Sequence, residues 1–266
     1  MNTDYFLGES IELIDVIDYK YKAIQLYTLG KSKEAIELCL EGLEKFSMNK
    51  ILLAYVILFC TKSEDYDLAT KYYILLKDNI PMKEWDMWQF SYSLIYLLNK
   101  NEIDENQCRN LIRDYMEYVP DDERAYLFEG VLEFRLGNIC KSKELLTNHI
   151  MKIYNTPHCI LQLLNIYLGE ENYEEVVYLS NYFVISGHMQ PPYFSQTFQA
   201  YEKYMSEDAE IHIKLLRNER VEKSELHNLI NSYKGLLECT EPKIYFDQQI
   251  EKRIKKLQEI LENSKL

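Results

Sequence analysis

The sequence predicts an all-α protein: a solenoid of about five helical hairpins, followed by a helical C-terminal cap. Two observations predict this fold class. The first is a ladder of five positions spaced by 34, 39, 34 and 34 residues, namely Ala35, Ala69, Cys108, Ser142 and Val176. Four of these residues are small, which indicates paired helices that repeatedly touch at one close contact. The second is the scarcity of helix breakers, because 266 residues include only eight Gly and six Pro.

The hairpins follow from apolar stripes and helix breakers in chain order. The first stripe, Tyr19–Leu29, ends at Gly30, and a second helix begins at Ser32 with a stripe that continues to Leu43. The other predicted pairs are Ile51–Thr61 with Tyr66–Leu76, Trp85–Leu98 with Asp104–Tyr118, Arg124–Leu136 with Cys140–Tyr154, and His158–Leu168 with Tyr173–Ile185. The 39-residue interval fits a longer turn before Asp104, because insertions between repeats lie in loops.

After Pro192 the period is lost, and the expected helices are Tyr193–Met205, Asp208–Arg217, Lys223–Cys239 and Lys243–Asn263. We therefore predict a repeat array over residues 1–190 and a non-repeating helical region over residues 191–266, because terminal units of solenoids differ from internal ones. The last helix carries a narrow apolar seam of Ile250, Ile254, Leu257 and Leu261. The seam either caps the last repeat or forms a homodimer contact, and we favour the cap.

Charge and composition exclude several classes of partner. Lys and Arg number 30 against 43 Asp and Glu, and the resulting net charge of −13 repels phosphate, so we predict no nucleic-acid partner. The longest apolar run, Ile51–Cys60, is too short to span a bilayer and predicts a buried helix, with no membrane partner. Residues 1–12 are acidic and lack a basic start, so we expect no export signal. The six cysteines form no C-x-x-C pair, which is typical of reduced thiols and predicts a cytoplasmic location.

Chemistry-bearing patterns are absent from the sequence. It contains no nucleophile elbow, phosphate-binding loop, zinc-protease motif or calcium loop. The one metal hypothesis joins His149 with the adjacent pair His158 and Cys159, but neighbouring helix residues point roughly 100° apart and further ligands are not identifiable. We therefore predict no metal, no cofactor and no enzymatic activity.

The stretch LGKSKEAI, Leu29–Ile36, resembles the turn of a tetratricopeptide repeat. That pattern has a small residue and an aromatic in the first helix, Gly at the turn, Ala early in the second helix and Pro at its end. The first hairpin supplies Tyr19, Ala23, Gly30 and Ala35. Gly42 and Ser47 stand where the pattern has its second Ala and its Pro, and later hairpins match less fully. The resemblance covers residues 16–190 and rests mainly on the fixed period.

The resemblance implies a concave groove, lined by the first helix of each hairpin, that holds a peptide or a partner protein. One subgroup clamps a C-terminal carboxylate with Lys followed four residues later by Asn. Lys20 matches the Lys, but Ile24 replaces the Asn, so no carboxylate clamp is expected. Side chains one helical step from the packing positions are the groove candidates: Lys20, Ile24, Tyr27, Ala54, Leu58, Gln89, Tyr96, Phe134 and Asn165.

These side chains suit an extended or helical peptide with apolar anchors, although aromatic residues also simply fill the spaces between helices. We therefore predict a non-catalytic scaffold or adaptor that binds a protein or peptide in the groove. The alternative is a peptide-sensing regulatory protein that inhibits a partner by direct binding, because repeats of this kind also form sensor domains. The sequence does not name the partner.

Overall fold

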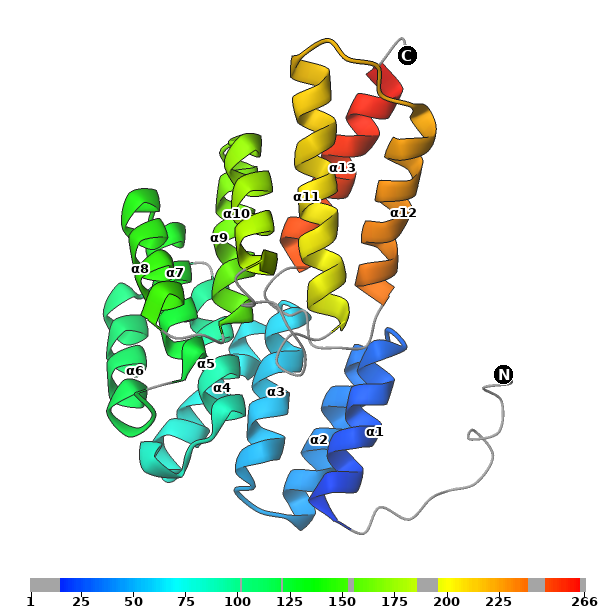
Figure 1. Ribbon diagram of the computed structural model, residues 1–266. Helices are drawn as coiled ribbons and strands as arrows, with labels where there is room; N and C mark the ends of the chain where they lie inside the picture. The colour runs from blue at the N-terminus through cyan, green and yellow to red at the C-terminus, as the bar shows by residue number, and fades with distance from the viewer. Residues whose placement is uncertain are drawn as a thin grey trace. The chain divides into compact units, whose positions relative to one another are not determined.

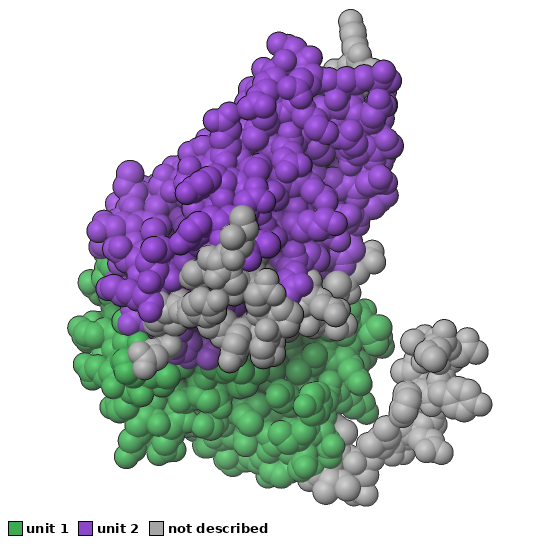
Figure 2. All heavy atoms as spheres, in the orientation of Figure 1, with its two compact units in different colours: residues 1–120 green, residues 121–266 purple. Residues whose placement is uncertain are grey.

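The computed structural model describes residues 15–100, 102–120, 122–152, 156–185, 196–238 and 247–263. Within these ranges every regular element is a helix (Figure 1), so the predicted all-α class is confirmed. The chain forms two compact units, unit 1 over residues 1–120 and unit 2 over residues 121–266 (Figure 2). The boundary that the sequence predicts between residues 190 and 191 lies outside the described residues.

The described residues of unit 1 form three helical hairpins. They are α1 (Val16–Thr28) with α2 (Ser32–Lys45), α3 (Lys50–Lys62) with α4 (Tyr66–Asn79), and α5 (Met87–Asn99) with α6 (Glu105–Tyr118), and the short 3-10 helix η2 (Met82–Glu84) precedes α5. The two helices of each hairpin pack together, and the first helices α1, α3 and α5 contact one another in order. Ten consecutive residues of α3, Leu52–Thr61, are buried, and no helix of the described chain is long and apolar enough to cross a membrane.

Unit 2 continues the packing of consecutive helices. Its helices are α7 (Glu123–Arg135), α8 (Ile139–Lys152), α9 (Pro157–Gly169), α10 (Tyr173–Ile185), α11 (Gln196–Leu216), α12 (Lys223–Glu238) and α13 (Asp247–Asn263). Helix α11 contacts α9 and α10, α12 contacts α11, and α13 contacts α12. The sequence predicts two helices where the structure has the single α11. That prediction was wrong because no Gly or Pro interrupts this stretch, and Asp208, which resembles a helix start, is instead a buried residue inside the helix.

The five ladder residues mark the close contacts within the hairpins. Each lies near the start of a second helix, α2, α4, α6, α8 or α10, and each has 0% of its surface exposed. In the fourth hairpin the Ser142 hydroxyl donates a hydrogen bond of 2.7 Å to the Gly130 carbonyl on α7. A Cβ atom on Gly130 would lie 2.7 Å from Cδ2 of Leu146, so a larger residue there would have to displace the buried Leu146 side chain of α8. The predicted close contact is therefore confirmed.

The turns inside four hairpins share one backbone shape. Gly30 and Gly137 adopt φ values of +77° and +81°, and Glu64 and Glu171 adopt +60° and +61° at the corresponding turn positions of the next hairpins. Glycine enters this left-handed region without steric cost, whereas a side chain with a Cβ atom is strained there. The hairpin geometry therefore keeps a left-handed residue even where the sequence does not supply glycine.

A buried carboxylate joins the last three helices of unit 2. Asp208 on α11 accepts hydrogen bonds from Arg253 on α13, at 2.8 Å from Nε and 2.6 Å from a terminal nitrogen, and from the Tyr233 hydroxyl on α12 at 3.2 Å. The ring Nδ1 of His212 lies 3.0 Å from the same carboxylate. We call Asp208, His212, Tyr233 and Arg253 the Asp208 clasp. Burial would raise the pKa of Asp208, but hydrogen bonds from His212 and Arg253 outweigh burial and hold that pKa below its ordinary value.

The C-terminal seam lies against the core of unit 2. Ile250 and Leu257 are 0% exposed and Ile254 is 9% exposed, and they share one core cluster with Leu229 and Leu236 of α12. Leu261 packs against the same cluster and is partly buried. The seam of α13 therefore packs inside unit 2.

Candidate functional site

A row of aromatic side chains runs across the first helices of unit 1; Tyr55, Phe59 and Tyr92 are buried, and the members that reach the surface are Lys20, Tyr27 and Trp88. Its members are one cation and five aromatic side chains, which we call the Lys20 cluster: Lys20, Tyr27, Tyr55, Phe59, Trp88 and Tyr92. Helices α1, α3 and α5 supply two members each. On α3 and α5 the two aromatic residues are four positions apart, which places them on the same face of the helix.

The rings form a continuous series from α1 to α5. Tyr27 stacks on Phe59 with ring centroids 4.7 Å apart and an angle of 17° between the ring planes. Tyr55 then lies 5.6 Å from Phe59 and 5.3 Å from Tyr92, and Trp88 lies 5.6 Å from Tyr92. Such distances are typical of favourable aromatic pairs. Burial raises the pKa of Tyr55, so its hydroxyl stays neutral and keeps its hydrogen-bonding proton at neutral pH.

Lys20 places a positive charge at the edge of this series. Its Nζ atom lies 5.5 Å from the ring centroid of Trp88, 5.9 Å from Tyr55 and 5.3 Å from Tyr21, within the range of cation–π attraction. Lys20 forms no ion pair with any carboxylate among the residues that the structure describes. Its three N–H donors can therefore bind water or a ligand. The cluster combines apolar rings with a cation that could receive an acidic group.

The structure separates the groove candidates of unit 1 into two groups. Lys20 and Tyr27 belong to the Lys20 cluster, and Ile24 lies between them on α1 and is partly buried. Four other candidates are buried and offer no surface to a ligand as placed: Ala54, Leu58, Gln89 and Tyr96.

The polar ends of two buried candidates are already used inside unit 1. The Gln89 amide donates to the Lys50 carbonyl at 3.0 Å and accepts from the Asp86 backbone at 2.9 Å. The Tyr96 hydroxyl lies 2.7 Å from Oγ1 of Thr70 on α4. These two side chains therefore hold helices of unit 1 together.

Four members of the Lys20 cluster were missed by the sequence reasoning. The prediction from the sequence named Ala54 and Gln89 instead, and each of these is one residue away from a cluster member. The groove face had been assigned relative to the small residues at the helix contacts. A signal was present: aromatic pairs four residues apart recur 33 residues later, as Tyr55 with Phe59 and then as Trp88 with Tyr92. A repeated pair of this kind marks a shared helix face independently of the ladder.

The two groove candidates of unit 2 contribute to its packing. Phe134 on α7 is partly buried and packs against the unit 2 core. Asn165 on α9 accepts a hydrogen bond of 2.7 Å from the Tyr201 hydroxyl on α11, and its amide donates to the Leu161 carbonyl at 2.9 Å. Asn165 therefore ties α9 to α11.

The histidines of the metal hypothesis have separate partners. His149 is buried and stacks on Tyr126 at 4.0 Å, and burial, aided by the charge of Lys152, lowers its pKa to about 4. His158 instead lies 2.6 Å from Oε1 of Glu123. No group of three or more His, Cys, Asp or Glu that could hold a metal occurs in the described part of the chain.

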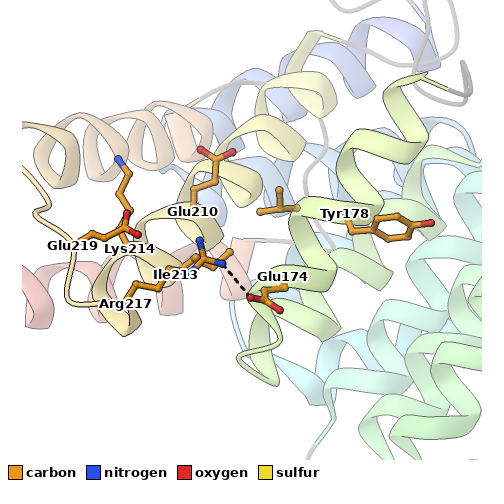
Figure 3. A pocket seen from close by; sticks show the side chains of 8 residues that line it. Glu174, Tyr178, Glu210, Ile213, Lys214, Arg217 and Glu219 are labelled. Atoms are coloured by element: carbon orange, nitrogen blue, oxygen red, sulfur yellow. Dashed lines mark hydrogen bonds and ion pairs between the residues drawn. The ribbon is translucent and has the colours of Figure 1, made fainter.

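Unit 2 has a pocket between α10 and α11, with a volume of about 490 Å³ (Figure 3). Its lining combines apolar and charged side chains: Glu174, Val177, Tyr178, Glu210, Ile213, Lys214, Arg217 and Glu219. Figure 3 shows Arg217, which directly follows α11, reaching Glu174 at the start of α10, and their ion pair measures 3.4 Å. The pocket is distinct from the Lys20 cluster, since the residues that line it belong to unit 2 alone.

No protein-family model and no curated protein sequence matches this chain. Solved structures do match it. A thermophilic TPR protein of Thermus thermophilus is 15% identical, with a TM-score of 0.53 over 71% of this chain and 97% of the other. A tetratricopeptide repeat protein of Parabacteroides merdae is 14% identical, with a TM-score of 0.59 over 91% of this chain and 84% of the other. The chain therefore has the tetratricopeptide-repeat fold that its sequence predicts, an α-α solenoid of helical hairpins.

Proposed function

We propose that this protein is a non-catalytic scaffold that binds a segment of a partner protein on the Lys20 cluster of unit 1. The tetratricopeptide-repeat fold supports a role in protein interaction in general. The observation that carries the specific proposal is the Lys20 ammonium, which lies over aromatic rings without a carboxylate partner in the described chain.

The chemistry of the cluster defines the segment that would bind. Tyr27 and Trp88 are only partly buried, so their rings can contact aliphatic or aromatic anchors of a ligand. An acidic side chain of the ligand would replace water at Lys20 and form a charge-assisted hydrogen bond. The expected ligand is therefore a peptide segment with apolar anchors and an acidic residue.

The experiment is a selection of random 16-residue peptides on the immobilised full-length chain, followed by fluorescence anisotropy with the selected peptides. Lys20→Met keeps the aliphatic stem and removes the charge, and we expect it to weaken binding about tenfold. Lys22→Met is the matched control, because Lys22 is exposed on the same helix and its loss changes the net charge equally. We expect the control to bind within about twofold of the unchanged chain.

Two results would contradict the proposal. One is a selection that yields no peptide with an acidic residue beside apolar anchors. The other is equal weakening by Lys20→Met and Lys22→Met, which would assign the effect to overall charge. Thermal unfolding of both variants, followed by circular dichroism, shows whether either change acts through folding instead.

A cytosolic location, with no nucleic acid among the partners, is part of the same proposal. The described cysteines support it, because Cys39, Cys60, Cys108, Cys140 and Cys159 are free thiols. Burial raises the pKa of Cys39 and Cys60 to about 12 and of Cys108 to about 11. Thiols that remain protonated are poor nucleophiles and fill the core as small apolar groups. The net charge of −13 argues against nucleic acid.

A further inference from the structure

The pocket between α10 and α11 offers apolar surface to solvent. Val177 and Ile213 are partly buried in it, and Tyr178 beside them is 63% exposed. Tyr182, one turn further along α10, is 39% exposed and extends the aromatic wall beyond the pocket. Neighbouring exposed aromatic side chains beside a concave site are typical of surfaces that bind a partner.

The charges around the pocket are unbalanced. Both cations of the lining already have carboxylate partners, since Arg217 pairs with Glu174 at 3.4 Å and Lys214 pairs with Glu225 at 2.9 Å. Glu210 and Glu219 have no ion pair among the described residues. The hydrogen bond to Glu225 raises the pKa of Lys214, and the negative charges of Glu225, Glu210 and Glu219 raise it further.

We propose that this pocket is a second binding site, which takes a basic amphipathic segment of a partner protein. An apolar side chain of that segment occupies the space beside Val177, Tyr178 and Ile213. Lysine or arginine side chains of the same segment meet Glu210 and Glu219, whose charges they balance. The volume of about 490 Å³ lies within the range of ligand pockets. The net charge of −13 attracts a basic segment from a distance.

The two proposed sites prefer ligands of opposite charge. The Lys20 cluster offers a cation to an acidic segment, whereas the pocket offers the carboxylates of Glu210 and Glu219 to a basic one. The pocket proposal rests on unit 2 alone and does not depend on the function proposed for unit 1. A failure at one site therefore leaves the other testable.

The test uses the full-length chain and a fluorescein-labelled 16-residue peptide of Leu and Lys in an amphipathic helical pattern. Its reference is the same peptide with each Lys replaced by Glu. Anisotropy should show binding of the Lys peptide and not of the Glu peptide. We expect Glu210→Lys with Glu219→Lys to raise the dissociation constant about tenfold. Glu251→Lys with Glu259→Lys, an exposed pair on α13, is the matched control and should change it by less than about twofold.

A second variant tests the apolar half of the site. Tyr178→Ser removes the exposed ring without changing charge, and we expect it to weaken the Lys peptide about fivefold. Equal effects of the two charge-reversal pairs would overturn the proposal, as would binding of both peptides alike or of neither. The proposal would also be overturned if Lys20→Met lost binding of the Lys peptide while Tyr178→Ser bound it normally, because the peptide would then bind at the Lys20 cluster. Sedimentation that shows self-association lost in Tyr178→Ser would assign the pocket to a second copy and overturn the proposal as well.

Discussion

The two units of the protein differ in how they bury polar groups. In the described part of unit 1 the buried polar side chains are all uncharged: Thr61, Gln89, Ser91 and Ser93. Unit 2 also buries ionisable side chains, namely Asp122, Glu133, His149, Glu202, Asp208, His212 and Arg253. The hairpins of unit 1 therefore pack by shape and neutral hydrogen bonds, whereas unit 2 buries ionisable groups both in its hairpin α7–α8 and in its C-terminal helices α11 and α13.

The Asp208 clasp shows what buried charge adds. A carboxylate that is bound from α12 and α13 fixes the rotation of α11 relative to both, because each donor must point at the same two oxygens. Apolar packing alone tolerates many arrangements of similar volume. The clasp therefore selects one arrangement of these three helices, although burying the charges of Asp208 and Arg253 costs desolvation free energy.

Substituting one partner in the Asp208 clasp should have the largest effect among the tests of this difference in buried charge between the two units. Arg253→Met leaves Asp208 charged and buried without its main partner, and we expect the free energy of unfolding to fall by about 3–5 kcal/mol at pH 7. Urea unfolding followed by helical circular dichroism measures the change. Lys252→Met, an exposed neighbour on α13, should have an effect below about 0.5 kcal/mol.

Two further measurements make this test specific. The double variant Asp208→Leu with Arg253→Met replaces the pair by apolar groups and should recover most of the loss. The lowered pKa of Asp208 implies that the contribution of the clasp is present above the ordinary value of 3.8 and is lost as pH falls below it. If Arg253→Met costs no more than Lys252→Met, buried charge does not position these helices.

Glu202 provides a second and smaller test in unit 2. It is 6% exposed, and burial raises its pKa from 4.5 to about 7. The folded state thus binds a proton that the unfolded state has lost, so Glu202 makes the free energy of unfolding fall as pH rises from 4.5 to about 7. Glu202→Gln should remove that fall and stabilise the protein by about 2 kcal/mol at pH 8.

Urea unfolding at pH 5 and pH 8 measures this effect as a difference between the variant and the unchanged chain. The difference should shrink as pH approaches 4.5, where Glu202 is protonated in the folded state and increasingly so in the unfolded state. Glu210→Gln, at an exposed position of the same helix, is the control for the loss of one carboxylate. A constant difference at both pH values would mean that the amide packs better, and that the carboxylate does not titrate as proposed.

The smallest expected effect concerns the hairpin turns, which occur in both units. Glu64 of unit 1 adopts a left-handed φ of +60°, so Glu64→Gly removes strain and should stabilise the protein by about 0.5 kcal/mol. Ser63→Gly, at a neighbouring position with φ of −93°, gains no such relief and should destabilise it slightly. Thermal unfolding compares the two variants, and stabilisation by Ser63→Gly alone would contradict the strain argument.

The ladder made most of the hairpin order predictable, because a small residue at the helix contact is a local requirement that the sequence shows directly. The Ser142 ladder position and the turn at Gly137 illustrate this. The sequence predicts two helices in place of the continuous α11, because aspartate is a common residue at helix starts and Asp208 resembles one. Its actual role depends on Arg253, which is 45 residues away. Side chains that interact across so many residues produce no local pattern in the sequence.

The candidate site was predictable only in part. Lys20 and Tyr27 were among the groove candidates because the first helix of the array was assigned correctly. Ala54, which the sequence named, is fully buried, and the neighbouring Tyr55 belongs to the Lys20 cluster, because adjacent helix residues point roughly 100° apart. The pocket of unit 2 was not foreseen, because it brings α10 next to α11, and the sequence reasoning placed those helices in different regions of the chain.

The position of Arg253 also affects the order in which the protein is made. During synthesis the hairpins of unit 1 can close as soon as each second helix emerges, because their contacts join neighbouring segments. Asp208 emerges 45 residues before its partner. The two hydrogen bonds from Arg253 to Asp208 can therefore form only after α13 has left the ribosome, whereas His212 and Tyr233 are available earlier.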